Sequence, residues 1–150
     1  MTSISYEEVF SSFLGNITDY NIASMNSTDA FELMTEYLHK TIADPYVKHI
    51  FSDVSLDDET QVLSYTLVRD TNDKDFVINA LSKWMVYEWY AGKVNNIQNI
   101  TQFFGNKETK WLSQAAHSAE NRSLRDTAYK EARFYIQNRG YIDNSYLGGA

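Results

Sequence analysis

The hydrophobic and polar positions of this chain follow a helical period over most of its length. Residues 5–14 combine a capping box, Ser5 with Glu8, with apolar residues at helical spacing, which predicts a short first helix. A second helix is predicted over about 27–43. It must end there because Pro45 disfavours helical backbone in the residue before it.

One stretch alternates instead with the two-residue period of a strand. Apolar and polar side chains alternate through residues 60–68, and residues 54–56 repeat the pattern just upstream. These two segments predict a β-hairpin, with Asp57–Glu59 as its turn and a single helical turn over 46–51 before it. An isolated two-stranded hairpin is marginal in water, so we expect it to lie against a helix or a neighbour.

The third predicted helix, residues 74–91, is apolar or aromatic on nearly every face. A helix of this kind is buried nearly all round, and a small domain can achieve this by placing part of the helix against another chain. We therefore assign Trp84, Trp89 and Tyr90 to a subunit interface, with an ordinary core as the alternative. Gly92 is expected to end or kink this helix, and a further short helix is predicted before Gly105.

Residues 106–138 contain neither Pro nor Gly, and Gly140 provides a helix-ending signal. This predicts a long helix of about 50 Å at ~1.5 Å per residue. Its apolar stripe changes face near Asn121, so either the helix breaks there or its halves pack on different partners. We favour the second interpretation, with the second half against a neighbouring subunit. Its stripe consists of Leu124, Ala128, Ala132, Tyr135 and Ile136.

The C-terminal segment 139–150 is predicted to be an extended arm. Its apolar residues are too numerous for a merely solvated terminus, so it is a candidate to dock on another protein. Together these elements predict one mainly α domain over residues 1–150. It would be a small helical bundle with one long C-terminal helix, a small β-hairpin insertion and the extended arm.

Composition supports a folded chain and removes several kinds of chemistry. The 150 residues are 43% hydrophobic and 15% aromatic, which is enough for a core and argues against disorder. The absence of Cys excludes disulfides, thiolate nucleophiles and Cys-ligated metals. No apolar run reaches the ~18–20 residues of a membrane span, and no signal peptide is apparent. We therefore expect no membrane contact and assembly in the cytoplasm.

The net charge of −7 is unevenly distributed. Residues 1–75 hold 4 basic and 14 acidic side chains, whereas residues 76–150 hold 9 basic and 6 acidic ones. The acidic first half argues against wrapping nucleic acid, because attraction to phosphate dominates such binding. The same asymmetry favours head-to-tail association of copies, although a solvated acidic face is the simpler interpretation.

The clusters that could carry chemistry have simpler structural explanations. His39, His49 and His117 lack the spacing that places two imidazoles on one helix face, so structural histidines are favoured. The acidic residues 57–59, with Asp53, could serve acid–base catalysis or hold a hard cation. A turn, however, favours Asp for its local hydrogen bonds. No phosphate-binding loop or nucleophile elbow occurs, so we expect no catalytic residues, no metal and no cofactor.

Several strings of this chain resemble head–tail connector (neck or adaptor) proteins of long-tailed phages and prophages of Gram-positive bacteria. The resemblance runs over most of the chain and depends on order and coverage, since none of the strings is a mechanistic motif. Its strings are Ile4–Phe10, Pro45–Phe51, Asp75–Met85, Glu88–Trp89, Asn99–Phe103, Ser113–His117 with Leu124, and Arg139–Tyr146.

This resemblance implies a virion subunit that forms a ring, commonly twelvefold, under the portal protein. The ring would extend the channel for passing double-stranded DNA without sequence-specific binding, and would present a surface to the stopper or tail-completion protein. In that family a long helix and a C-terminal arm make portal and intersubunit contacts. By position, the portal- or neck-binding residues would be Arg133, Arg139, Tyr141, Ile142, Tyr146 and Leu147. The hairpin residues Asp57, Asp58 and Glu59 would point toward the lumen or the next ring.

Three alternatives from other classes remain. The chain could be a small oligomeric helical module that binds or regulates another protein. It could be a different neck component, such as the stopper or tail-completion protein. It could also be a carboxylate-dependent enzyme that uses Asp53, Asp57 and Asp58, in which case Asp58→Asn would abolish function and leave assembly intact.

Overall fold

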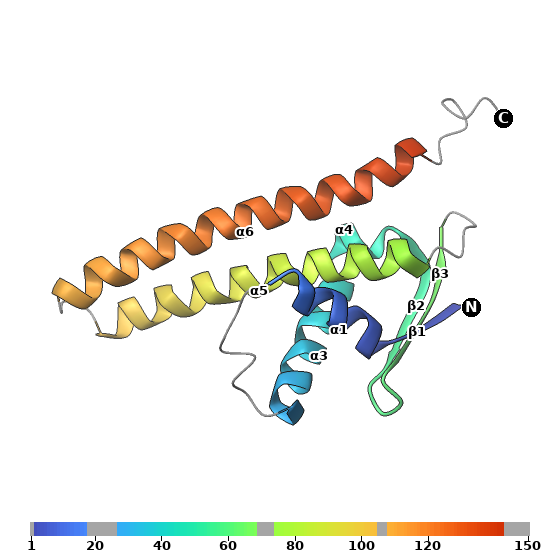
Figure 1. The fold of residues 1–150 in the computed structure, drawn as a ribbon, viewed down its shortest axis with the longest axis horizontal. Coiled ribbons are helices and arrows are strands. Elements are labelled where there is room, and N and C mark those ends of the chain that lie inside the picture. Colours follow the sequence, from blue (N-terminus) through green and yellow to red (C-terminus); the bar gives the residue numbers. More distant parts are fainter. Residues whose placement is uncertain (1, 18–26, 69–73, 105–107, 143–150) are drawn as a thin grey trace. The chain divides into compact units, whose positions relative to one another are not determined.

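The computed structural model of the chain is mostly helical, with a small three-stranded antiparallel sheet (Figure 1). It describes residues 2–17, 27–68, 74–104 and 108–142. Within these ranges, side chains are described except for residues 27, 93–104, 108–119, 121 and 139–142. The chain divides into two compact units, Met1–Met85 and Val86–Ala150, and the boundary falls inside a continuous helix.

The first unit combines the sheet with short helices. Its elements are β1 (Thr2–Ser5), α1 (Tyr6–Gly15), α3 (Ser27–Ala43), α4 (Pro45–Lys48), β2 (Phe51–Asp57), β3 (Val62–Leu67) and the first part of α5 (Lys74–Phe104). The helix predicted over about 27–43 is confirmed as α3. The turn predicted over 46–51 is the shorter α4, which ends at Lys48 because β2 begins soon afterwards.

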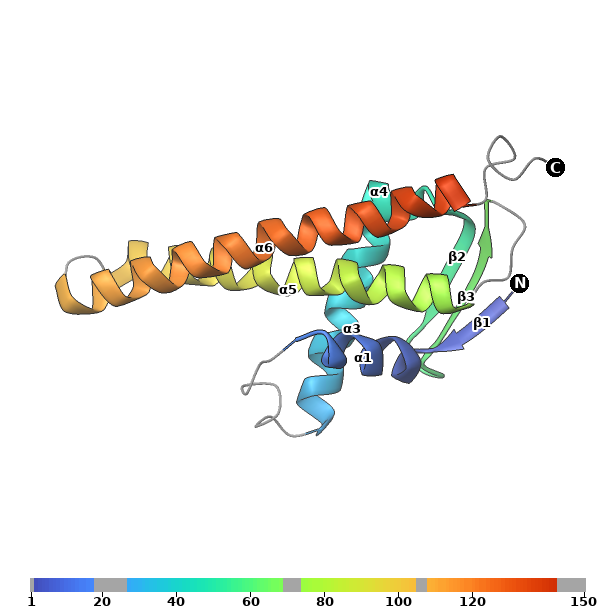
Figure 2. The same cartoon turned by 45° about the horizontal axis from the view of Figure 1, so that its top comes forward.

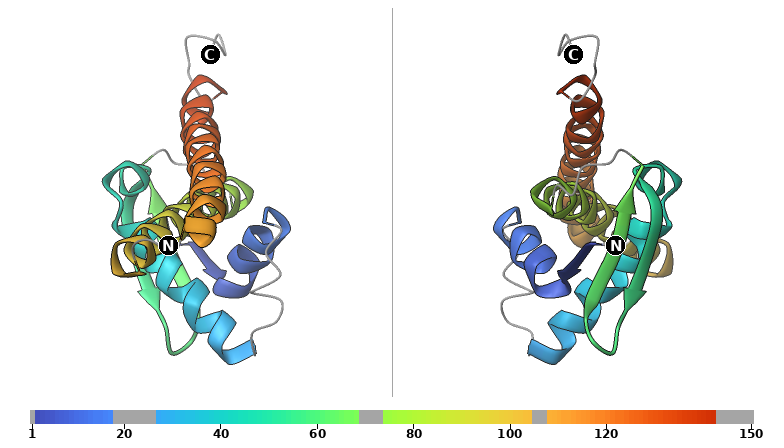
Figure 3. Two further views of the ribbon diagram at one scale, coloured as in Figure 1. Left: turned by 90° about the vertical axis from the view of Figure 1, so that its left-hand side faces the viewer. Right: turned by 90° about the vertical axis from the view of Figure 1, so that its right-hand side faces the viewer.

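The sheet has β3 at its centre and the strand order β1-β3-β2. Ile4, Leu63 and Leu56 are cross-strand partners on its inner face, and Figures 1 and 3 show α1 and α3 on that side. The outer face is polar, and Ser3 Oγ lies 3.1 Å from Ser64 Oγ. The sequence predicted only two strands. It missed β1 because four residues are too few for a clear alternation.

The first helix begins as the sequence predicts. The Ser5 hydroxyl accepts a bond from the Glu8 amide at 3.3 Å, and the Glu8 carboxylate accepts one from the Ser5 amide at 3.0 Å. The capping box is therefore confirmed, and it satisfies two amides at the helix end that lack partners within the helix. One face of α1 is buried, and the ring of Phe10 meets that of Phe31 on α3 edge-on at 4.9 Å.

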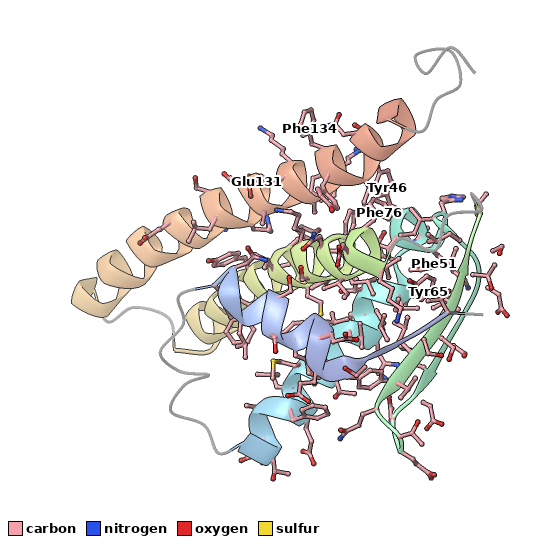
Figure 4. All side chains as sticks on the ribbon, turned by 45° about the vertical axis from the view of Figure 1, so that its right-hand side comes forward. Tyr46, Phe51, Tyr65, Phe76, Glu131 and Phe134 are labelled. Carbon is pink, nitrogen blue, oxygen red and sulfur yellow. The ribbon has the colours of Figure 1, made fainter. Side chains whose placement is uncertain are left out.

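The core of the first unit is formed by apolar side chains from the sheet and from all of its helices. Tyr46, Phe51, Tyr65 and Phe76 are labelled in Figure 4, and the rings of Phe51 and Tyr65 are 5.8 Å apart. The largest fully buried side chains are Trp84, Tyr6, Tyr65, Phe13, Leu38, Leu63, Leu81, Met85, Val9, Val47 and Val77.

The second unit consists of the rest of α5 and the long helix α6 (Glu108–Ile142), which runs back along it (Figure 2). The prediction of two helices separated at Gly92 is wrong, since α5 continues to Phe104. One glycine costs a helix only ~1 kcal/mol relative to alanine, which the rest of a long helix can absorb.

The helix α6 is continuous and does not break near Asn121. It also runs through Gly140 to Ile142, so residues 139–142 are helical and the predicted extended arm does not begin at residue 139. The reason is that Gly140 marks a helix end only when the chain leaves the helix there. The remainder of the predicted arm, with Tyr146 and Leu147, lies outside the described residues.

Candidate functional site

A polar cluster centred on Asp58 links the turn between β2 and β3 to two helices. The hydroxyl of Tyr6, the first residue of α1, donates to Asp58 Oδ1 at 2.6 Å. On α3, the Nε2 of His39 lies 2.9 Å from both carboxylate oxygens of Asp58. Three elements that are distant in sequence therefore meet at one carboxylate.

The turn itself is fixed by the neighbouring aspartate. Asp57 Oδ1 accepts bonds from the amides of Glu59 at 3.1 Å and Thr60 at 3.2 Å, an arrangement typical of Asp in turns. Gln61 closes the turn in the left-handed region, with φ of 57°. The carbonyl of Gln61 also accepts a bond from the Tyr6 amide at 2.9 Å, which adds a backbone link between the turn and α1.

The charges of the cluster follow from these bonds. The pKa of Asp58 is lowered, first by the hydrogen bond from Tyr6 and then by the bond to His39, because both favour the ionised carboxylate. The pKa of Tyr6 is raised, first by burial and then by its bond to Asp58 and the nearby negative charge. The pKa of Asp57 is lowered, chiefly by its bonds with Thr60.

This geometry indicates what the acidic residues can do. Asp58 is directed at Tyr6 and His39 rather than at a second carboxylate, so the pairing needed for acid–base work by two carboxylates is absent from this cluster. Among the residues that the structure describes, no group of three or more potential metal ligands is close enough to hold a metal ion. Within the same ranges, no helix is long and apolar enough to cross a membrane.

Tyr6 and His39 are the residues of this cluster that the sequence did not predict to be there. Tyr6 was interpreted only as part of an apolar helix face, and His39 only as a structural histidine without a named partner. They are 52 and 19 residues from Asp58, so no local spacing connects them. Only the folded chain brings them together.

The aromatic residues assigned to a subunit interface are largely covered within the single chain. Trp84 is 1% exposed, and its ring stacks on that of Tyr46, with centroids 5.4 Å apart and planes 18° apart. Trp89 is 7% exposed and Tyr90 is half-buried. Burial of the two tryptophans therefore does not require a second subunit.

The second half of α6 is only partly covered. Ala128 and Ala132 are buried and Tyr135 and Ile136 are half-buried, whereas Leu124 is 39% exposed. The stripe assigned to a neighbouring subunit is thus already packed at its two alanines. The sequence analysis did not single out Phe134, which is 63% exposed and is labelled in Figure 4.

The predicted portal-binding residues fall in differently described regions. Arg133 is exposed; it donates to the hydroxyl of Tyr129 at 3.2 Å, and its guanidinium lies 5.9 Å from that ring. Tyr129 in turn lies 5.1 Å from the ring of Tyr87. The side chains of Arg139, Tyr141 and Ile142 are outside the described set.

Comparison with known proteins identifies no relative. No protein-family model matches the chain, and no curated protein or solved structure shows significant similarity to it.

Proposed function

We propose that this chain is a structural subunit of the head–tail connector of a long-tailed phage. Copies of it would form a ring that docks under the portal, extends the DNA channel and joins the DNA-filled head to the tail. The bundle, hairpin and C-terminal arm of the predicted fold belong to this proposal. The strings that resemble neck proteins support it, and so does the incomplete cover of α6.

The observation that carries the proposal is the exposed apolar surface of α6. Phe134 and Leu124 are exposed by 63% and 39% within the single chain, although α6 also contributes buried alanines. Large exposed aromatics are normal when scattered, but a ring subunit needs apolar surface that only assembly covers. Glu131 and Phe134 both project from α6 in Figure 4, so charged side chains surround this surface.

Charge distribution supports contact between copies. The first unit carries 5 basic and 14 acidic side chains, a net charge of −9, whereas the second carries 8 basic and 6 acidic ones, a net charge of +2. In a head-to-tail ring, the second unit of one copy can meet the first unit of the next. A predominantly acidic chain also suits a DNA conduit, because it does not bind phosphate strongly.

Electron microscopy of the purified chain, alone and mixed with the portal protein, tests this proposal. We expect ring-shaped particles that are lost in Phe134→Asp, because a charge on this surface opposes assembly. Gln137→Asp is the matched control, since Gln137 is also exposed on α6 and its substitution adds the same charge. Equal ring formation by both variants would remove α6 from the interface, and no rings under any condition would contradict the function.

A further inference from the structure

Asp58 differs from the other acidic residues of its turn in where its bonds go. The carboxylate of Asp57 bonds amides of the turn itself, whereas that of Asp58 reaches side chains on α1 and α3. The side chains of Asp58 and His39 are 54% and 46% exposed, so protons reach this link freely. Tyr6, by contrast, is fully buried.

We propose that Asp58 is an acid-sensitive latch, which holds the β2–β3 turn on α1 and α3 while its carboxylate is ionised and releases the turn when it is protonated. The latch is a property of the single chain and does not rest on the proposed ring.

The chemistry of the three bonding groups makes protonation incompatible with the observed arrangement. Tyr6 donates its hydroxyl proton to one oxygen of Asp58, and His39 Nε2 is 2.9 Å from both oxygens. An ionised carboxylate can accept from both partners, and such charge-assisted bonds are about twice as strong as neutral ones. Protonation removes the charge and makes one oxygen a donor, so it weakens the contacts with both helices at once.

The charged and titratable groups around Asp58 come from three elements. Tyr6 faces it from α1 and His39 from α3, and Asp57 is its neighbour in the turn. A protonated His39 strengthens the latch, whereas the negative charge of Asp57 opposes it slightly. Once the latch is released, the bond from the Tyr6 amide to the Gln61 carbonyl is the remaining direct link between α1 and the turn. That amide is therefore the reporter of the latch.

Amide hydrogen exchange of Tyr6 at neutral pH tests the latch with Asp58→Asn, which imitates the neutral carboxyl group. We expect exchange of the Tyr6 amide to rise about tenfold. The amide of Leu63, which lies in β3 between its two neighbours, should exchange at an unchanged rate. Glu59→Gln is the matched control, because it removes one negative charge from an exposed residue of the same turn. His39→Gln should raise Tyr6 exchange less than Asp58→Asn does.

Two outcomes would overturn the proposal. One is equal Tyr6 exchange in Asp58→Asn and Glu59→Gln; the other is an equal rise at Tyr6 and Leu63, which would indicate general destabilisation. If Asp58→Asn does not fold, an acid titration of the unmodified chain by NMR provides the answer. The Tyr6 and His39 ring signals should then shift with the titration of Asp58, and signals that ignore it would exclude the latch.

Discussion

Trp84 stacks on Tyr46 with ring centroids 5.4 Å apart and planes inclined by 18°. This contact fixes α5 to α4 through two large rings, and Trp84 itself is 1% exposed. Trp84 therefore acts as a core residue of the first unit. In this unit, an all-round apolar helix finds its partners mainly in its own chain.

The first prediction concerns the stability that Trp84 provides. Replacing it with alanine should lower the free energy of unfolding by about 3–5 kcal/mol, because a large buried ring is lost and a cavity remains. Phe134→Ala should change it by less than about 0.5 kcal/mol, since that ring is mostly exposed. Urea unfolding of both variants measures the difference, and similar losses would contradict the assignment of Trp84 to the core.

A second prediction compares two threonines of α3. Thr41 is fully buried, and its hydroxyl has no hydrogen-bond partner among the described residues. The Thr35 hydroxyl donates to the Phe31 carbonyl at 2.8 Å. Thr41→Val should therefore be neutral or stabilising by about 1 kcal/mol, whereas Thr35→Val should destabilise by about 0.5–1.5 kcal/mol. The ranking is checked by thermal unfolding, and the reverse order would show that Thr41 has a partner in solution.

The third prediction concerns the serine pair that joins α1 to α5. The hydroxyl of Ser12 donates to that of Ser82 at 2.9 Å, and Ser82 donates onward to the carbonyl of Asn79 at 3.1 Å. A double-mutant cycle with Ser12→Ala and Ser82→Ala should give a coupling energy of about 0.5–1.5 kcal/mol. Additive effects of the two substitutions would mean that the bond does not contribute to stability.

A fourth prediction follows from the shifted pKa values of Asp58 and Tyr6. The folded-state pKa of Asp58 is lowered, so its contribution is present above the unfolded pKa of about 3.9 and is lost as the pH falls through the folded value. The pKa of Tyr6 is raised, so its contribution is present below about 10 and is lost as the pH rises through the folded value.

Urea unfolding across a pH series measures both limbs. Asp58→Asn should flatten the acid limb of the stability curve, and Tyr6→Phe should flatten the alkaline limb. Glu59→Gln is the control, and it should leave both limbs unchanged. If the acid limb of Asp58→Asn matches that of the unmodified chain, the bonds of Asp58 do not contribute to stability.

The parts of the fold that the sequence predicted are those determined by local chemistry. The Ser5–Glu8 capping box and the helix stop before Pro45 depend on residues within a few positions, and both are present in the structure. Gly92 and Gly140 were misleading because a glycine ends a helix only if the chain leaves it there. Packing along a long helix overrides that local preference.

The candidate site was less predictable because its members are joined by tertiary structure. The sequence marked Asp57, Asp58 and Glu59 as a turn, and local hydrogen bonding of Asp57 agrees with this. The partners of Asp58 depend on how α1 and α3 pack beside the sheet, and no periodicity encodes that. Exposure of Phe134 was equally hidden, because a single aromatic among polar residues of a helix leaves no pattern in the sequence.

The most direct test of the connector proposal is the mass of the purified chain in solution, measured by native mass spectrometry and light scattering with and without the portal protein. The proposal predicts a closed ring of about twelve copies, formed by the chain alone or on meeting the portal. A stable monomer or dimer whose mass does not change with the portal would contradict it, and would favour a small protein-binding module instead.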